Sequence, residues 1–110
     1  MNTGVEACET ALKFARRWGY EVKKIPANHA ESVFALKNFW GRTITACGSS
    51  EDPDRHLNFG PYPPGIHLVE YNNIHALKKI FKEKKNICSF MIEPIQGEGG
   101  VIIPSDTYMQ

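Results

Sequence analysis

Apolar residues recur at helical spacing between Thr3 and Trp18, which predicts an amphipathic helix. Thr3 and Glu6 have the spacing of a capping box, in which a hydroxyl and a carboxylate satisfy the first free N–H groups of a helix. Gly19 is predicted to end the helix, because glycine is common just after a helical C-terminus. The predicted apolar stripe consists of Cys8, Ala11, Leu12, Ala15 and Trp18.

Short apolar runs at residues 32–36, 66–69 and 87–92 predict buried strands. Residues 42–47 are predicted to form a short helix, and Asn72 or Asn73 to cap a longer one. The stretch 49–65 is rich in proline and glycine and predicts a long loop, while residues 104–106 predict the start of another helix. Because helices alternate with short apolar strands, the pattern predicts an α/β fold with a mainly parallel sheet.

Two segments with polar and aromatic side chains directly follow predicted strands, at residues 38–42 and 93–98. In a parallel sheet, ligands bind beyond the carboxyl ends of the strands. A helix that follows a strand begins at the same edge, which places the turn at Thr3 there as well. The sequence therefore predicts that three separated segments meet in one cleft.

Each of these segments suits a particular ligand group. The free N–H groups of the turn at residues 3–5 can hold an anion, and each contact with the helix dipole contributes roughly 0.3–1 kcal/mol. Phe39 or Trp40 can stack on a flat ring, and Arg42 can bind a carboxylate through two parallel N–H groups. The sequence thus indicates a flat, anionic ligand.

The same residues also have purely structural interpretations. Thr3 can be an ordinary helix cap, the aromatic side chains can belong to the core, and Arg42 can form a surface ion pair. Glu93 and Glu98 can orient a cofactor or hold a cation, and they can equally be solvated loop charges. Residues alone leave these alternatives open.

Composition and charge argue against several classes of function, namely nucleic-acid binding, membrane spanning and metal binding. The chain has 110 residues, 42% of them hydrophobic and 23% charged, which fits one globular domain or part of one. A net charge of +1 argues against binding to nucleic acid, and the lysine-rich side of the helix at 78–85 is interpreted as a solvated face. No apolar run approaches the ~20 residues of a membrane-spanning helix. Neither the cysteines nor the histidines have ligand spacing, so no metal site is predicted.

The motifs "MNTGVEACETALKFARRWGY", "VFALKNFWGRT", "SSEDPD", "FGPYPPG" and "FMIEPIQGEGGV" occur in this order along the whole chain. Together they resemble the class III, or omega, aminotransferases, which use pyridoxal 5′-phosphate. Members that act on acetylornithine or 4-aminobutyrate usually carry histidine where this chain has Trp40, so the resemblance favours the ornithine-specific branch. The alternatives are an aminotransferase of those other types, a non-catalytic anion-binding module, and an interaction domain that acts through the basic helix.

The resemblance implies a fold of type I among pyridoxal-phosphate enzymes, with a three-layer α/β/α large domain of which residues 1–110 are an incomplete piece. The implied reaction transfers the δ-amino group of L-ornithine to 2-oxoglutarate and yields glutamate 5-semialdehyde and glutamate. The resemblance further implies that the full-length protein is a homodimer or a higher homo-oligomer. The implied compartment is the mitochondrial matrix or the cytoplasm, with any targeting segment outside this chain.

The resemblance also implies cofactor-binding residues. The backbone of Thr3, Gly4 and Val5 would hold the cofactor phosphate, Phe39 would stack on the pyridine ring, and Glu93 would support the cofactor.

The implied substrate-binding residues are Trp40, which would line the pocket, Arg42, which would receive a carboxylate, and Glu98. Glu98 would pair with an arginine from later in the family's sequence, a switch that lets one site accept both substrates. The Schiff-base lysine of the family, the aspartate that pairs with the pyridinium nitrogen and that second arginine do not match any residue of the chain. The 110 residues alone are therefore not expected to catalyse transamination.

Overall fold

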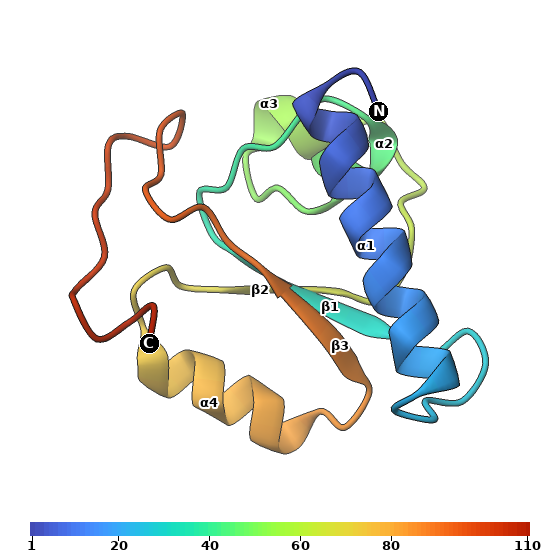
Figure 1. Cartoon of the computed structure of the whole chain (residues 1–110). Coiled ribbons are helices and arrows are strands. Elements are labelled where there is room, and N and C mark those ends of the chain that lie inside the picture. Colours follow the sequence, from blue (N-terminus) through green and yellow to red (C-terminus); the bar gives the residue numbers. More distant parts are fainter.

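A three-stranded parallel sheet lies at the centre of the structure, a computed structural model that describes residues 1–110 (Figure 1). The middle strand is β1 (Glu31–Ala35), which pairs in parallel with β2 (Ile66–Val69) on one side and β3 (Ile87–Met91) on the other. Val33 and Phe34 of β1 are completely buried. The predicted α/β class with a parallel sheet is confirmed, and the carboxyl ends of all three strands lie at one edge.

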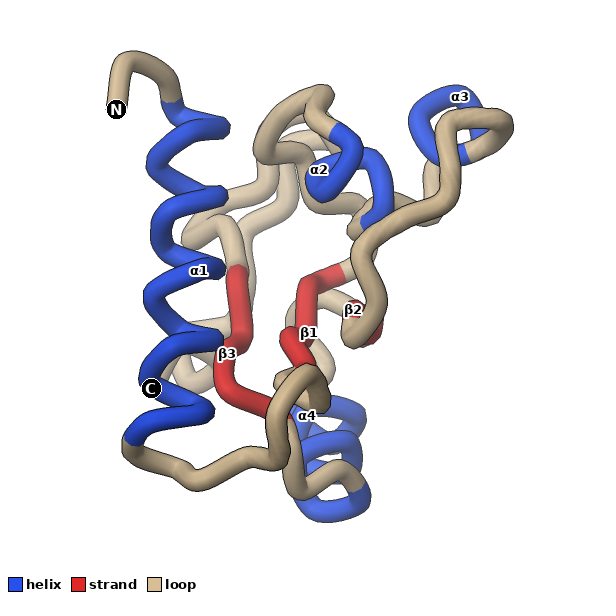
Figure 2. Tube along the Cα trace, turned by 90° about the vertical axis from the view of Figure 1, so that its right-hand side faces the viewer, coloured by secondary structure: helices blue, strands red, loops and turns tan.

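Helices cover both faces of this sheet, so that the chain forms three layers (Figure 2). The helix α1 (Gly4–Glu21) packs against β3, and α4 (Ile74–Glu83) packs on the opposite face against the cluster around Val33. Two short helices, α2 (Ile44–Gly48) and α3 (Pro53–His56), lie with the start of α1 at one end of the sheet (Figure 1). No helix is both long enough and apolar enough to span a bilayer.

The prediction that Gly19 ends the first helix is wrong, because α1 continues to Glu21. Gly19 is buried inside the helix where it crosses β3. A Cβ atom at Gly19 would lie 2.9 Å from the Cβ atom of Cys88 and 3.0 Å from the Cδ1 atom of Ile25. The glycine therefore permits close packing of helix on strand rather than terminating the helix.

The helix α3 lies within the stretch 49–65, where no regular structure was predicted. Asp52 caps it by accepting the N–H of Asp54, and Pro53 occupies the first turn, where proline lacks only an N–H that would be free anyway. The helix predicted from residue 104 is also absent, because residues 106–109 form a turn that buries Tyr108 against Tyr71. The remaining elements match their predicted positions to within two residues, with Thr43 and Asn73 as N-caps.

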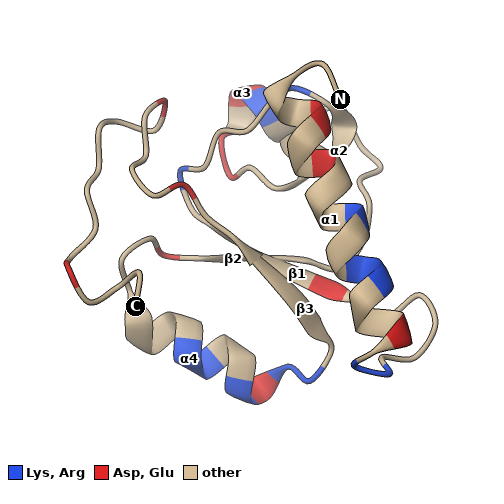
Figure 3. Cartoon of the chain, viewed as in Figure 1, with Lys and Arg blue, Asp and Glu red and all other residues tan.

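The buried core is small and lies mainly between the sheet and α4, in clusters around Val33 and around Ala35. Of the predicted α1 stripe, Leu12 is buried but Trp18 remains 46% exposed. Lysines follow the outer side of α4, where Lys79 reaches Glu83, and basic and acidic residues are interspersed elsewhere (Figure 3). This distribution fits the interpretation of the basic helix side as a solvated face.

Candidate functional site

The loop after β1 is held in place by hydrogen bonds from its own side chains to β1 and to the segment that follows α2. Asn38 is buried and donates hydrogen bonds from Nδ2 to the carbonyl oxygens of Ala35, at 2.8 Å, and Ser49, at 2.7 Å. The indole N–H of Trp40 donates to Ser49 Oγ at 2.8 Å, and its ring stacks on Phe34. Since Asn38 and Trp40 flank it, Phe39 occupies a fixed position between them.

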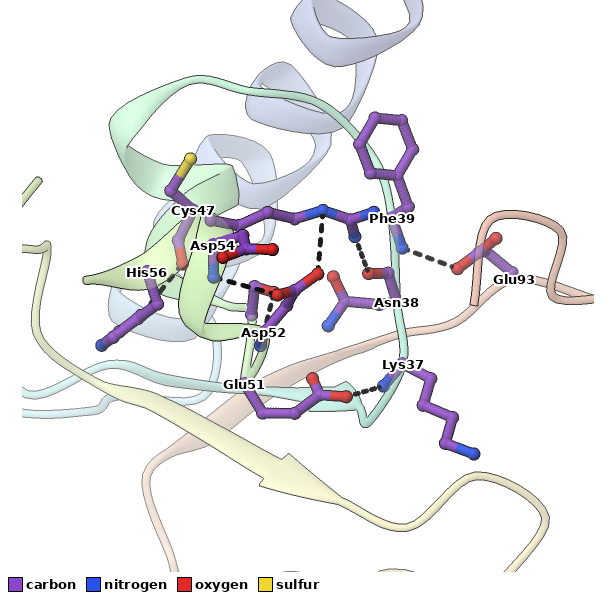
Figure 4. Close-up of polar contacts among 11 residues, drawn as sticks. Lys37, Asn38, Phe39, Cys47, Glu51, Asp52, Asp54, His56 and Glu93 are labelled. Carbon is purple, nitrogen blue, oxygen red and sulfur yellow. Dashed lines mark hydrogen bonds and ion pairs between the residues drawn. The ribbon is translucent and has the colours of Figure 1, made fainter. Parts of the chain in front are cut away.

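The loop after β3 is joined to the loop after β1 by two side chains. Glu93 Oε1 accepts the backbone N–H of Phe39 at 3.0 Å (Figure 4). Gln96, which is 1% exposed, donates from Nε2 to the carbonyl of Leu36 at 2.8 Å. These bonds fix the segment that carries Glu98 relative to the segment that carries Phe39.

The first turn of α1 packs directly against the same loop. A Cβ atom at Gly41 would lie only 2.3 Å from Val5 Cγ2, and Gly41 has a φ of +148°, a conformation that favours glycine. Nearby, the hydroxyl of Thr43 donates to Glu9 Oε1 at 2.9 Å. The start of α1 and the two loops therefore meet at the carboxyl edge of the sheet, as the sequence predicts.

The turn that begins α1 is capped but leaves free donors. Thr3 Oγ1 accepts the N–H of Glu6 at 3.3 Å, and Glu6 Oε2 accepts the N–H of Asn2 at 2.8 Å. This bond from Asn2, followed by that from the Thr3 hydroxyl, lowers the pKa of the Glu6 carboxyl. The N–H groups of Gly4 and Val5 have no acceptor within the chain, and no atom lies within 4 Å of a Cβ atom built on Gly4. An anion can approach these N–H groups closely.

A cavity of about 500 Å³ opens beside Phe39. Charged side chains of both signs and apolar side chains line it: Phe39, Arg42, Ile44, Cys47, Asp54, Arg55, Phe59 and Glu98. Three residues predicted from the sequence to bind cofactor or substrate, namely Phe39, Arg42 and Glu98, are thus brought together although 59 positions separate the first from the last. The volume falls within the range of small-molecule sites.

Arg55 of α3 is the part of this cavity that sequence analysis missed most clearly. Its guanidinium carbon lies 4.6 Å from the centroid of the Phe39 ring, which is a cation–π contact. Its Nε atom lies 3.6 Å from Asp52 Oδ2, and it makes a long bond of 3.5 Å to the carbonyl of Asn38 (Figure 4). The Asp52-Pro53 pair, a helix-start signal, was the feature of the sequence that could have revealed α3.

The other predicted site residues lie around the cavity rather than in its wall. Trp40 lines a separate cavity of about 80 Å³ that it shares with Phe34 and Glu93. Val5 does not line the main cavity and instead lies against Gly41, the residue before Arg42. Glu93 acts on Phe39 through the backbone. No cluster of three or more histidine, cysteine or acidic side chains has the arrangement of a metal site.

Comparison with known proteins identifies the family. The sequence profile described as "Aminotransferase class-III" matches residues 1–110. The chain belongs to the class III aminotransferases.

Similar members of this family carry the name ornithine aminotransferase. The mitochondrial ornithine aminotransferase of Drosophila melanogaster is 56% identical over 110 residues, which are 100% of this chain and 25% of the relative. The ornithine aminotransferase of Oceanobacillus iheyensis is 51% identical over 110 residues, covering 100% of this chain and 27% of the relative. The chain therefore spans about a quarter of the length of the curated relatives it matches.

Solved structures agree with this family assignment. The ornithine aminotransferase of Toxoplasma gondii, crystallised with oxidised glutathione, has a TM-score of 0.96 and 51% identity, covering 99% of this chain and 26% of that one. That protein has pyridoxal phosphate at partial occupancy in its active site. The acetylornithine aminotransferase of Elizabethkingia anophelis has a TM-score of 0.73 and 34% identity, over 99% of this chain and 22% of that one.

Proposed function

We propose that the protein carrying this chain is a pyridoxal-phosphate-dependent aminotransferase that moves the δ-amino group of L-ornithine to 2-oxoglutarate. The products are L-glutamate 5-semialdehyde and glutamate. The observation that carries the proposal is the cavity shared by Phe39, Arg42 and Glu98, beside the uncovered N-terminus of α1. The relatives named ornithine aminotransferase, at 51–56% identity, support this choice within the family.

The residues of the chain fit the cofactor. The free N–H groups of Gly4 and Val5 suit its phosphate, because Thr3 caps the helix without blocking the approach over Gly4. Phe39 is the aromatic surface against which the ring can stack, and Glu93 holds the backbone of Phe39. Bound there, pyridoxal phosphate supplies the electron sink of the reaction, while the protein orients it.

Arg42 and Glu98 are proposed to select the substrates. Arg42 has no ion-pair partner in the chain, so its planar guanidinium is free to receive a carboxylate through two N–H groups. Glu98 is proposed to pair with an arginine that no residue of this chain supplies, and release of that arginine would admit the second carboxylate of 2-oxoglutarate. A removable partner for a charged side chain of a binding site is a means of switching specificity.

None of the lysines in the chain is assigned to covalent catalysis. Those of α4 lie on its exposed side, away from the cavity. We propose that residues 1–110 are an incomplete piece of the large domain, inactive alone, in a homodimer or higher homo-oligomer. The partners are small molecules rather than nucleic acid or membrane. The mitochondrial relatives favour the mitochondrial matrix, and the cytoplasm is the other compartment considered.

Acetylornithine is the second candidate substrate. Trp40 distinguishes this chain from members that usually carry histidine, yet its indole is bound to Ser49 and lies outside the main cavity. Trp40 therefore bears less directly on substrate choice than the sequence implies.

The test uses the protein as its natural gene encodes it, supplied with pyridoxal phosphate. Formation of glutamate from 2-oxoglutarate is measured with either L-ornithine or N-acetylornithine as amino donor, because glutamate is the product that both donors share. A kcat/KM at least about tenfold higher for ornithine, equivalent to ~1.4 kcal/mol, is the expected result. Preference for acetylornithine would support the second candidate, and activity with neither donor would contradict both.

A further inference from the structure

The aromatic ring of Phe39 carries a guanidinium group over one of its faces. The Cζ atom of Arg55 lies 4.6 Å from the centroid of the ring, which is the distance of a cation–π contact. The hydrogen bond to Glu93 fixes the backbone of Phe39 but not its side-chain torsions. Arg55 therefore supplies a contact that holds the ring itself.

Two oxygen atoms hold the guanidinium of Arg55 from its other sides. Its Nε atom lies 3.6 Å from Asp52 Oδ2, and its Nη1 atom donates to the carbonyl of Asn38 at 3.5 Å (Figure 4). Asn38 is in turn buried and bound to the carbonyls of Ala35 and Ser49. Each contact to Arg55 is weak, but its side chain is only 29% exposed, and together they restrict where the guanidinium can lie.

The helix α3, which carries Arg55, is fixed to the segments on either side of it. The Nδ1 atom of His56 lies 3.1 Å from the carbonyl oxygen of Cys47 at α2, and the His56 ring stacks on Tyr62 with 4.4 Å between the centroids. The hydroxyl of Tyr62 donates to the carbonyl of His56. Because a single helical turn has little stability of its own, these contacts are what keep α3, and with it Arg55, in place.

We propose that Arg55 is a positioning residue that holds the Phe39 ring at the angle needed to stack on the ring of pyridoxal phosphate. This inference rests on the proposed function and adds to it a residue that acts through Phe39. The guanidinium occupies one face of the Phe39 ring and leaves the opposite face for the cofactor. A side chain that is already oriented loses less conformational entropy when a ligand binds, so the contact raises affinity for the cofactor ring.

A direct electrostatic role of Arg55 would give a different result. Arg55 also lines the main cavity, where its charge would attract the cofactor phosphate. That attraction would not require the ring of Phe39, and it would act on inorganic phosphate as well. The positioning role requires the Phe39 ring and acts only on ligands that carry a ring of their own.

The test uses the protein as its natural gene encodes it, freed of cofactor and prepared as wild type, Arg55→Met, Phe39→Leu and the double variant. Calorimetry measures the dissociation constant of pyridoxamine 5′-phosphate, which has the ring and phosphate of the cofactor but forms no covalent bond with a lysine. Competition by inorganic phosphate measures the phosphate contacts alone. Circular dichroism in the absorption band of the bound ring reports its orientation. Arg17→Met is the control, because Arg17 is an exposed arginine paired with Glu21.

We expect Arg55→Met to weaken pyridoxamine 5′-phosphate binding about threefold to tenfold, as the loss of a partly buried cation–π contact implies. Its circular dichroism per bound ligand should also change, and Arg55→Lys, which keeps the charge without the planar group, should lie between Arg55→Met and the wild type. In the Phe39→Leu protein, the added Arg55→Met change should alter affinity less than about 1.5-fold, because the residue through which Arg55 acts is gone. Inorganic phosphate should bind all variants equally, which also shows that they are folded, and Arg17→Met should match the wild type.

An equal loss of affinity on Arg55→Met with and without the Phe39 ring, or a parallel loss for inorganic phosphate, would overturn the positioning role and leave the proposed function intact. Tighter binding by Arg55→Met would also overturn it, since Arg55 would then occupy the face that the cofactor needs. If the wild-type protein did not bind pyridoxamine 5′-phosphate, the proposed function itself would fail, and the inference with it. The wild-type measurement therefore separates the two failures.

Discussion

The backbone N–H of Phe39 and the carboxylate of Glu93 are joined by a 3.0 Å hydrogen bond that links the loops after β1 and β3. This bond fixes the backbone that carries the Phe39 ring relative to the segment that carries Glu98. Position within the cavity wall, rather than side-chain type alone, is what makes Phe39 a candidate surface for a flat ring.

Glu93→Ala is expected to leave the Phe39 N–H without an acceptor in a half-buried position. The free energy of unfolding should fall by about 1–3 kcal/mol, the usual penalty for an unsatisfied donor, and cofactor affinity should fall as well. Glu93→Gln keeps an oxygen acceptor and should recover most of both quantities. Denaturant unfolding and a pyridoxal phosphate titration measure them, and equal effects of the two variants would contradict the role given to this bond.

Gly41→Ala is expected to destabilise the site strongly. The new Cβ atom would lie 2.3 Å from Val5 Cγ2, and the φ of +148° is unfavourable for alanine. We expect a loss of about 1–3 kcal/mol or more, together with weaker cofactor binding, because the start of α1 must move. Gly97→Ala is the matched control, since no atom lies within 4 Å of its added Cβ. Thermal unfolding of the two variants measures the difference; similar midpoints would argue against close packing at Gly41.

Arg42→Lys retains the charge but loses the planar pair of N–H donors. The kcat/KM for 2-oxoglutarate should fall at least about tenfold, whereas the dissociation constant for pyridoxal phosphate should change far less. Arg17→Lys, at an exposed position paired only with Glu21, is the control and should resemble the wild type. Equal loss of oxo-acid turnover and cofactor affinity would be inconsistent with carboxylate binding by Arg42.

Glu6 should make the stability of the protein depend on pH in the acidic range. Hydrogen bonds from Asn2 and Thr3 lower the pKa of its carboxyl in the folded state. A lowered pKa means that the stabilisation is complete above the unfolded-state pKa and is lost as the pH falls through the lowered folded-state value. The wild type should therefore be more stable than Glu6→Gln at neutral pH, and the two should converge under acidic conditions. The measurement is the thermal midpoint of both proteins across this pH range. A difference between wild type and Glu6→Gln that stays the same at every pH would contradict a dependence on ionisation of Glu6.

The parallel sheet and the convergence of the segments could be predicted from sequence because they follow from simple periodicity. The short apolar runs fixed the strands, and parallel strands bring the residues that follow them, such as Phe39 and Glu98, to one edge. The capping spacing of Thr3 and Glu6 likewise located the start of α1 correctly.

What the sequence did not reveal depends on tertiary packing. Gly19 has the local signature of a helix end, but the approach of Cys88 gives it a different role. The single-turn helix α3 is too short for a periodic pattern, and although the Asp52-Pro53 pair signals a helix start, it does not show that Arg55 lies in the cavity wall. Trp40 does not line the main cavity, because its bond to Ser49 holds the indole outside it, and no residue pattern in the sequence predicts that bond.

The central claim is that the start of α1, the loop after β1 and the loop after β3 form one site for pyridoxal phosphate and a carboxylate substrate. A crystal structure of the naturally encoded protein with bound cofactor tests it most directly. We predict phosphate oxygens within about 2.7–3.2 Å of the backbone nitrogens of Gly4 and Val5, with the cofactor ring against Phe39. A cofactor bound away from Gly4, Val5 and Phe39 would contradict the account.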